Sequence, residues 1–289
     1  MSPFKIWFHA IRPNTLTVSL SPVLIGSSVA MTQGFFHPLT FLFTLLTSLG
    51  IQIVTNLSND YFDFLKGADT PARIGPLRVT QAGLVSLKEM KIAVFLTSAV
   101  TVLAGSYLIY QGGIVFALLV AVAIALAIGY TAGPYPLAYL GLGQLFTFVF
   151  FGPVATYCTY YLQTHQFAHP AWIAGLIPGL LSAAILTANN LRDADEDRST
   201  NKRTLVVRWG TAISKGLYCG MILTAALTPL FLIHYRHFVF LSLFVILPTI
   251  LLCLQTIKNQ ERPRYNVILV NTAQLLLIYT LIFCCSYML

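Results

Sequence analysis

Seven of the nine carboxylates in this 289-residue chain lie in two short clusters. The first cluster contains Asp60, Asp63 and Asp69, and the second contains Asp193, Asp195, Glu196 and Asp197. Each cluster lies at the end of an apolar stretch of helical length. Because ionisable groups at a membrane boundary are costly to keep, those that are kept are commonly functional. Two acidic clusters that can face each other therefore predict one cation-dependent site.

The first cluster has the spacing of metal ligands on one helix face. Asn59 and Asp63 are four residues apart, and Asn56 precedes Asp63 by seven residues. Side chains at these separations share one face of an α-helix. We expect the helix to end at Gly67, so that Asp69 can fold back from the loop toward the same ion. The metal ligands expected from this cluster are Asn59, Asp60, Asp63 and Asp69.

The second cluster repeats this pattern. Asp193 and Asp197 are also four residues apart, and Asn189 lies one turn earlier on the same face. Oxygen ligands without histidine or cysteine favour Mg²⁺ over zinc or a redox metal. We therefore expect two Mg²⁺ ions, with Asp193 and Asp197 as ligands from this side. Asp195 and Glu196 point elsewhere on the helical wheel and are expected to be solvated.

Basic side chains follow both clusters. A magnesium site with so few carboxylates is commonly completed by phosphate oxygens, and arginine and lysine pair well with phosphate. The pattern predicts a diphosphate clamp with the ligands Lys66, Arg73, Arg78, Asn189, Asn190, Lys202 and Arg203. The residues expected to act most directly in the chemistry are Asp63, Asp193, Lys66 and Arg73. The alternative is that these polar residues only cap helices or form a solvated surface.

The rest of the chain is apolar enough to lie in a membrane. Hydrophobic residues make up 57% of the sequence and charged residues 9%, and the mean hydropathy is +0.77. Runs of about 20 apolar residues are long enough to cross a bilayer as helices. We predict an all-α, polytopic membrane protein, a single domain over residues 1–289, with nine helices around a central cavity. The expected spans are 14–33, 38–62, 90–110, 114–131, 141–163, 170–192, 214–235, 238–256 and 265–287.

The placement of basic residues predicts the orientation in the membrane. With the N-terminus in the cytoplasm, 16 of the 17 lysines and arginines fall in cytoplasmic segments and only Arg236 falls outside, as the positive-inside rule favours. The loops after the second, fourth and sixth helices are then cytoplasmic caps, and the C-terminus lies outside the cell inner membrane. The net charge of +8 belongs to this cytoplasmic face, where it meets anionic headgroups and phosphorylated substrates. It does not indicate nucleic acid.

At the two clusters the chain resembles the UbiA-type intramembrane aromatic prenyltransferases. That family has a first motif of the form NDxxDxxxD and a second motif of the form DxxxD. Asn59, Asp60 and Asp63 match the first motif, and Asp193 with Asp197 matches the second.

The chain departs from the first motif at its last position, where Gly67 replaces Asp and Asp69 follows two residues later. The run NDYFDFLKGADTPARIGPLRVTQAGLVS, with this later Asp and its GPLR segment, is similar to the menaquinone branch of the family, the 1,4-dihydroxy-2-naphthoate prenyltransferases. So are the runs RPNTLTVSLSPVLIGS at 12–27 and NNLRDADEDRSTNKRTLVVRWG at 189–210. The last three helices match this branch in hydropathy only.

The resemblance implies Mg²⁺-dependent transfer of a polyprenyl group from polyprenyl diphosphate to 1,4-dihydroxy-2-naphthoate, with loss of the carboxylate, to give demethylmenaquinone. The allylic cation of such a reaction must be kept from water, and aromatic faces can stabilise it. The residues expected near the cation or the acceptor are Asn56, Tyr61, Tyr130 and Tyr135. For the tyrosines, the alternative is simple anchoring at the membrane interface. No obligate protein partner is implied.

Two other functions stay open at this point. The acceptor could be a different ring, such as another naphthoate, 4-hydroxybenzoate or homogentisate. A secondary transporter of an anionic solute could also use acidic residues as coupling sites. Such coupling residues belong near the bilayer midplane, whereas both clusters here lie at helix ends.

Overall fold

Long apolar helices make up most of this chain. The structure is a computed structural model that describes residues 1–69 and 74–289, and these residues form helices and connecting loops without a β-strand. The α-helices are α1 (Pro3–Ile11), α2 (Pro13–Met31), α3 (Pro38–Leu65), α4 (Leu87–Gly112), α5 (Ile114–Gly129), α6 (Leu137–Leu140), α7 (Gly143–Val149), α8 (Ala155–Thr164), α9 (His169–Ala174), α10 (Leu176–Ser199), α11 (Leu205–Leu227), α12 (Ile246–Lys258) and α13 (Tyr265–Met288). A π-helical turn, η1 (Phe150–Val154), and three 3₁₀ helices, η2 (Thr228–Phe231), η3 (His237–Val245) and η4 (Arg262–Arg264), lie between them.

Eight helical stretches of the described chain are long and apolar enough to cross a membrane. One of them combines α7, η1 and α8, and another combines α9 and α10. The prediction of an all-α, multi-pass membrane protein is thereby confirmed. One of the nine expected spans, 114–131, is not among these eight stretches. It corresponds to α5, which has only 16 residues and is shorter than the about 20 residues that usually cross a bilayer. Its start is set by Gly113, whose φ of 71° reverses the chain directly after α4.

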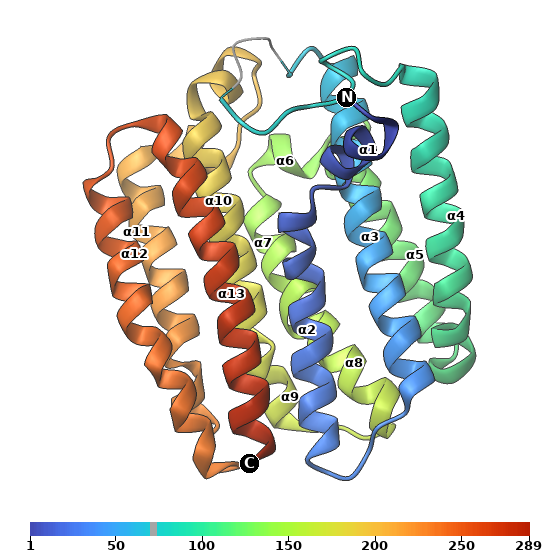
Figure 1. Cartoon of the computed structure of the whole chain (residues 1–289), viewed down its shortest axis with the longest axis vertical. Helices are drawn as coiled ribbons and strands as arrows, with labels where there is room; N and C mark the ends of the chain where they lie inside the picture. Colours follow the sequence, from blue (N-terminus) through green and yellow to red (C-terminus); the bar gives the residue numbers. More distant parts are fainter. Residues whose placement is uncertain (70–73) are drawn as a thin grey trace.

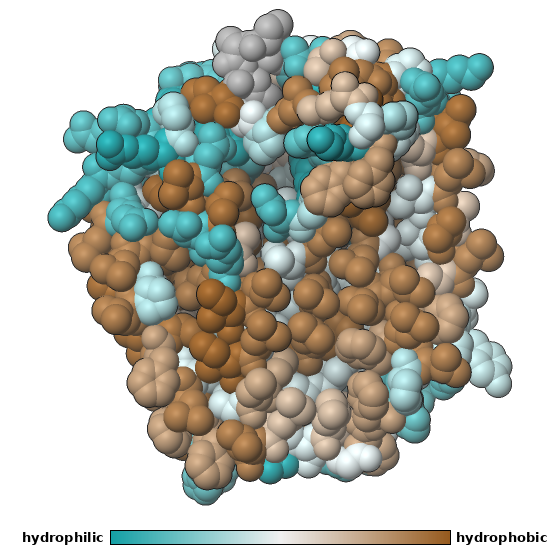
Figure 2. Space-filling view, viewed as in Figure 1, coloured by the Kyte–Doolittle hydropathy of each residue, from teal (hydrophilic) through white to brown (hydrophobic). Residues whose placement is uncertain are grey.

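The molecular surface divides by hydropathy. On the face that Figure 2 shows, a broad apolar band covers the middle of the bundle, and most hydrophilic residues gather at one end. A surface of this kind suits contact with lipid chains in the middle and with water and headgroups at the end. Both α3 and α10 finish at this polar end (Figure 1), so the fold carries the two acidic clusters to the same side of the molecule.

The stretch formed by α7, η1 and α8 is kinked. Pro153 cannot donate a backbone hydrogen bond, and Gly152 has non-helical backbone angles of −119° and −111°, so the regular helix is interrupted here. Gly152 packs so closely on α10 that an added Cβ would lie 2.6 Å from Gly179 Cα. This kinked segment provides Phe150 and Phe151 to the wall of an interior cavity.

Candidate active site

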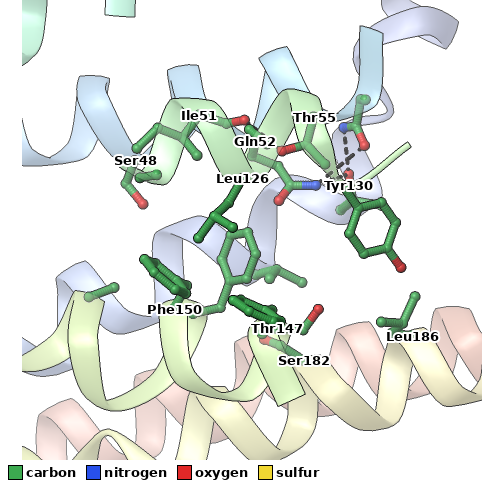
Figure 3. Close-up of a pocket in the computed structure, with 18 of the residues that line it drawn as sticks. Ser48, Ile51, Gln52, Thr55, Leu126, Tyr130, Thr147, Phe150, Ser182 and Leu186 are labelled. Carbon is green, nitrogen blue, oxygen red and sulfur yellow. Dashed lines mark hydrogen bonds between the residues drawn. The ribbon is translucent and has the colours of Figure 1, made fainter. Parts of the chain in front are cut away.

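A cavity of about 310 Å³ lies among α2, α3, α5, α10 and the kinked stretch. Its polar lining residues include Arg12, Thr15, Gln52, Asn56, Asn59, Asp63, Arg78, Tyr130, Thr131, Asn189, Asn190 and Lys202. Its apolar lining residues include Leu108, Phe116, Leu119, Val120, Leu126, Phe150, Phe151, Cys158 and Leu162. In Figure 3, Tyr130 and Leu186 lie toward one end of this cavity, and Ser48 and Phe150 lie toward the other. A cavity with a charged end and a long apolar wall fits an amphipathic ligand.

Asp63 lies at the charged end of the cavity, between two cations. Its Oδ2 is 3.4 Å from Arg78 Nη2 and 3.5 Å from Lys202 Nζ. Lys202 Nζ is also 3.9 Å from Asp197 Oδ1, so this lysine joins the first acidic cluster to the second. The Asp63 side chain is only 3% exposed, and its Oδ1 makes no hydrogen bond to any residue that the structure describes. A buried carboxylate oxygen without a partner is costly, and a bound cation or donor group would remove that cost.

Asp193, in the second cluster, is held differently. Arg192 donates to both of its oxygens, with Nε 2.6 Å from Oδ1 and Nη2 2.7 Å from Oδ2. Asn189 also donates to Oδ2, at 3.3 Å. Arg192 is only 1% exposed, and a buried bidentate pair of this kind is strong and directional. The predicted metal ligand Asp193 is therefore already bound to a cation of the protein itself.

Arg192 also connects the second cluster to the C-terminal helix. Its Nη1 donates to Asn266 Oδ1 on α13 at 3.0 Å, and Asn266 Nδ2 donates to the carbonyl oxygen of Ile74 at 3.3 Å. Sequence reasoning did not single out Arg192 or Asn266. The sequence did contain a signal for Arg192: it lies beside Asp193 at the end of an apolar run, where a charged side chain is costly unless it is paired.

Lys66 lies where α3 ends, beside the loop that follows α5. Its Nζ donates to the carbonyl oxygen of Thr131 at 2.6 Å and lies 4.8 Å from the centre of the Tyr139 ring. Burial lowers the pKa of Lys66, an effect that the charge of Asp63 opposes and that of Lys202 reinforces. Lys66 thus holds the loop between α5 and α6 against the first cluster while its charge acts on Asp63.

Comparison with known proteins decides which family has this arrangement. Residues 19–283 match the model of the UbiA prenyltransferase family. The chain belongs to the UbiA prenyltransferase family. The resemblance inferred from the motifs is thereby confirmed.

Relatives within the UbiA family align along most of this chain. It is 37% identical over 244 residues to the 1,4-dihydroxy-2-naphthoate octaprenyltransferase of Escherichia coli K12, covering 81% of this chain and 79% of that protein. It is 40% identical over 232 residues to the protein of the same name from Haemophilus influenzae, covering 77% of this chain and 75% of that protein.

Solved structures of UbiA homologs share the fold. The apo structure of a homolog from Aeropyrum pernix K1 has a TM-score of 0.68 at 17% identity, over 95% of this chain and 97% of that one. A homolog from Archaeoglobus fulgidus bound to GPP and Mg²⁺ has a TM-score of 0.66 at 13% identity, over 98% of this chain and 100% of that one. The helical arrangement described above is therefore the UbiA fold.

In this UbiA family member, the first-motif residues divide between the cavity and a neighbouring loop. Asn59 lines the cavity, whereas Asp60 is fully buried and accepts hydrogen bonds from the backbone N–H groups of Val79 at 3.2 Å and Thr80 at 3.1 Å. Consecutive residues of a helix point about 100° apart, so Asp60 faces the loop that carries Arg78. The structure gives Asp60 an anchoring contact to this loop, and its predicted metal contact stays a prediction.

Two further predicted residues are tied into the protein near the cavity. Asp69 Oδ1 lies 3.4 Å from Arg78 Nε, so the guanidinium joins Asp69 to Asp63. Asn56 lines the cavity and donates to the carbonyl oxygen of Ile11 at 2.7 Å and to Thr15 Oγ1 at 2.9 Å. The predicted residues that line the cavity are Asn56, Asn59, Asp63, Arg78, Tyr130, Asn189, Asn190 and Lys202.

Other predicted residues point elsewhere. Tyr135 is 78% exposed, Arg203 is exposed, and Tyr61 packs beside the small core of Leu57 and Met90. None of the three lines the cavity in the described structure, because Tyr135 and Arg203 turn outward in loops and Tyr61 occupies another face of α3. Arg73 lies outside the described residues. Asp195 was expected to be solvated, and its side chain is 66% exposed.

The residues at the charged end fit a magnesium ion only together with a phosphate. No three acidic, histidine or cysteine side chains of the described residues come together as a metal site. Asp63 and Asn59 nevertheless line one cavity, and the buried Oδ1 of Asp63 is without a hydrogen-bond partner in the described chain. Asn59 Oδ1 accepts a hydrogen bond from Thr131 Oγ1 at 3.1 Å. Mg²⁺ is commonly held by one or two carboxylates with substrate phosphates and water. The donor set therefore fits Mg²⁺ shared with a diphosphate.

Proposed function

We propose that this protein transfers a polyprenyl group from polyprenyl diphosphate to 1,4-dihydroxy-2-naphthoate, with loss of the naphthoate carboxylate, in menaquinone biosynthesis. The observation that carries the proposal is Asp63 between Arg78 and Lys202 at the charged end of a cavity whose remaining wall is largely apolar. A diphosphate matches the charged end, and an isoprenoid chain matches the apolar wall. The relatives from Escherichia coli and Haemophilus influenzae carry the name of this activity.

The residues at the charged end have distinct roles in this proposal. As the allylic C–O bond breaks, its electron pair leaves with the diphosphate, and Arg78, Lys202 and Lys66 stabilise the negative charge that develops there. When bound, Mg²⁺ supplies further positive charge at the phosphate oxygens. Asp63 and Asn59 would hold that metal, and we propose Asp197 as a ligand from the second cluster for a second ion.

The apolar part of the cavity keeps water from the reacting carbon. An allylic cation in contact with water would be lost to hydrolysis. Tyr130 lines the cavity, and its ring is our proposed aromatic contact for the cation. Asn56 also lines the cavity and is the proposed polar contact for the aromatic acceptor, whose nucleophilic carbon must lie close to the allylic carbon.

We propose that the charged end faces the cytoplasm and that the protein lies in the cell inner membrane. The support is the distribution of basic residues, of which 16 of 17 fall on the predicted cytoplasmic side. In this proposal α5 crosses as a ninth, short helix, so the N-terminus and C-terminus lie on opposite sides. The two termini lie at opposite ends of the bundle in Figure 1, which is consistent with an odd number of crossings.

A reconstituted assay tests the proposed reaction. Purified protein in detergent receives octaprenyl diphosphate, Mg²⁺ and 1,4-dihydroxy-2-naphthoate, and release of diphosphate and CO₂ is followed together with the prenylated product. We expect turnover that stops with a chelator and returns with Mg²⁺. Parallel reactions with 4-hydroxybenzoate and homogentisate measure the choice of acceptor. Prenylation of one of these in place of the naphthoate would change the proposed acceptor, and turnover that persists without any divalent metal would overturn the metal site.

A further inference from the structure

Tyr139 lies between the cationic side chains of the two acidic clusters. It belongs to α6, and the centre of its ring is 4.8 Å from Lys66 Nζ and 5.7 Å from Lys202 Nζ. Lys66 lies between Asp63 and Asp69 of the first cluster, and Lys202 follows the second cluster. The Tyr139 ring thus lies near a cation from each half of the site, at distances where cation–π attraction acts.

The Tyr139 hydroxyl is buried and makes no hydrogen bond to any residue that the structure describes. Buried tyrosine hydroxyls usually have a partner, since an unsatisfied polar group costs free energy. The carboxylate of Asp63 acts on this hydroxyl both through its charge and as a nearby acceptor, and Asp197 and Asp69 add their negative charges. An ordinary tyrosine with a pKa of about 10 is protonated at neutral pH, so Tyr139 presents a hydrogen-bond donor close to both acidic clusters.

The backbone holds this tyrosine in place. The N–H of Ala138 donates to the carbonyl oxygen of Tyr130 at 3.0 Å, which ties α6 to the end of α5. Gly141 ends α6 with a φ of 74°, and an added Cβ there would lie 2.9 Å from Arg208 Nε. These contacts fix α6 on both sides, next to Lys202, which lines the cavity; Tyr139 itself is not among the lining residues.

We propose that Tyr139 is a ligand of the donor diphosphate, whose hydroxyl donates a hydrogen bond to a phosphate oxygen while its ring orients Lys66 and Lys202 toward the same group. This role rests on the proposed function, because it requires a diphosphate at the charged end of the cavity. It also explains why an unsatisfied hydroxyl is kept there, since the phosphate oxygen supplies the missing acceptor. Sequence reasoning did not single out Tyr139, and its proposed contact with the diphosphate is separate from the cation contact proposed for Tyr130.

Binding of pyrophosphate in the presence of Mg²⁺, measured by calorimetry on the purified protein in detergent, tests this role. Tyr139→Phe removes only the hydroxyl and keeps the ring. A hydrogen bond to a charged group corresponds to about a tenfold change in affinity, so we expect pyrophosphate to bind Tyr139→Phe about tenfold more weakly. Tyr139→Leu, which also removes the face that orients the lysines, should bind more weakly still. Tyr135→Phe is the matched control from the loop just before α6, where the side chain is 78% exposed, and should bind as the wild type does.

Thermal unfolding separates a ligand role from a structural one. Because the hydroxyl has no partner in the described part of the free protein, Tyr139→Phe should keep or raise the Tm without ligand. The Tm increase on adding Mg²⁺ and pyrophosphate should then be smaller than in the wild type. A free protein whose Tm falls in Tyr139→Phe, with an unchanged shift on binding, would show a structural role and overturn the proposal.

The outcomes also separate this role from the proposed function. If wild type and Tyr139→Phe bind pyrophosphate equally while the wild type is an active prenyltransferase, the role of Tyr139 fails and the function stands. If the wild type binds no pyrophosphate with Mg²⁺, the diphosphate site itself is overturned, and the role of Tyr139 with it.

Discussion

The two acidic clusters differ in how their aspartates are paired. Asp63 has cations at 3.4 and 3.5 Å on one oxygen, and its other oxygen has no hydrogen-bond partner in the described chain. Asp193 has both oxygens bound by Arg192, at 2.6 and 2.7 Å. Asp63 in the first cluster therefore still has an oxygen that can bind a ligand, whereas both oxygens of Asp193 in the second cluster are bound by an arginine of the protein.

This contrast distinguishes an aspartate that can bind a ligand from one that stabilises the protein structure. An aspartate with a vacant lone pair can take a metal or a donor group at little cost, while an aspartate in a bidentate pair must first give up a strong partner. We infer that Asp63 is the principal ligand of the site. Asp193 is paired with Arg192, whereas Asp197 is joined to Asp63 through Lys202, so we propose Asp197 as the ligand from the second cluster.

The largest expected effect tests the first half of this comparison. Asp63→Asn keeps the size of the side chain but removes the charge that Arg78 and Lys202 share. We expect turnover in the reconstituted assay to fall about a thousandfold, as for the loss of a major electrostatic group in a dry site. The control is Asp195→Asn, because that side chain is 66% exposed and should leave turnover unchanged. Turnover within tenfold of the wild type would remove Asp63 from its central role.

The second prediction concerns stability at the other cluster. Asp193→Asn leaves the guanidinium of Arg192, which is 1% exposed, without its carboxylate. Breaking a buried pair in this way costs about 3 kcal/mol or more, so denaturant unfolding followed by circular dichroism should show a clear loss of stability. Asp63→Asn should lose much less, since its ion-pair distances are longer. Equal losses in the two variants would show that the clusters are not paired differently.

Lys202 should have a smaller effect, because Arg78 also faces Asp63. Lys202→Gln removes the cation that lies between Asp63 and Asp197 and one of the two cations on the Tyr139 ring. We expect the KM for the polyprenyl diphosphate to rise about tenfold, which corresponds to the loss of one charge-assisted contact. The KM for the aromatic acceptor should hardly change. Arg198→Gln is the control, since Arg198 is 61% exposed, and an equal rise there would indicate a general effect of surface charge.

The helices, and the helix face that carries each motif, could be predicted from the sequence because both depend on the local spacing of residues. Hydropathy marks helices, and an interval of four residues places Asn59 and Asp63 on one face. The pairing of Arg192 with Asp193 could not be predicted in this way, because neighbouring residues in a helix point apart and only the length of the arginine side chain brings them together. The place of Tyr139 depends on how α6 packs between distant segments, which local spacing does not encode.

Substitution of Asn266 has the smallest expected effect. It tests whether α13 helps to position the residues of the site. Asn266 accepts from Arg192 Nη1 at 3.0 Å and donates to the carbonyl oxygen of Ile74 at 3.3 Å, so it joins the second cluster to the loop that continues to Arg78. Asn266→Ala removes both hydrogen bonds but neither charge. Each hydrogen bond stabilises the protein by about 1 kcal/mol. Only part of this free energy affects the binding of the diphosphate, so we expect the KM for the donor to rise about threefold.

The matched control for this effect is Asn271→Ala, on the same helix but outside the network around Arg192. It should leave the KM for the donor unchanged. Combining Asn266→Ala with Asp193→Asn provides a double-mutant cycle, in which the two losses of stability should be less than additive because both act through Arg192. Full additivity would mean that Asn266 acts on the loop alone, and that the second cluster is held by Arg192 without help from α13.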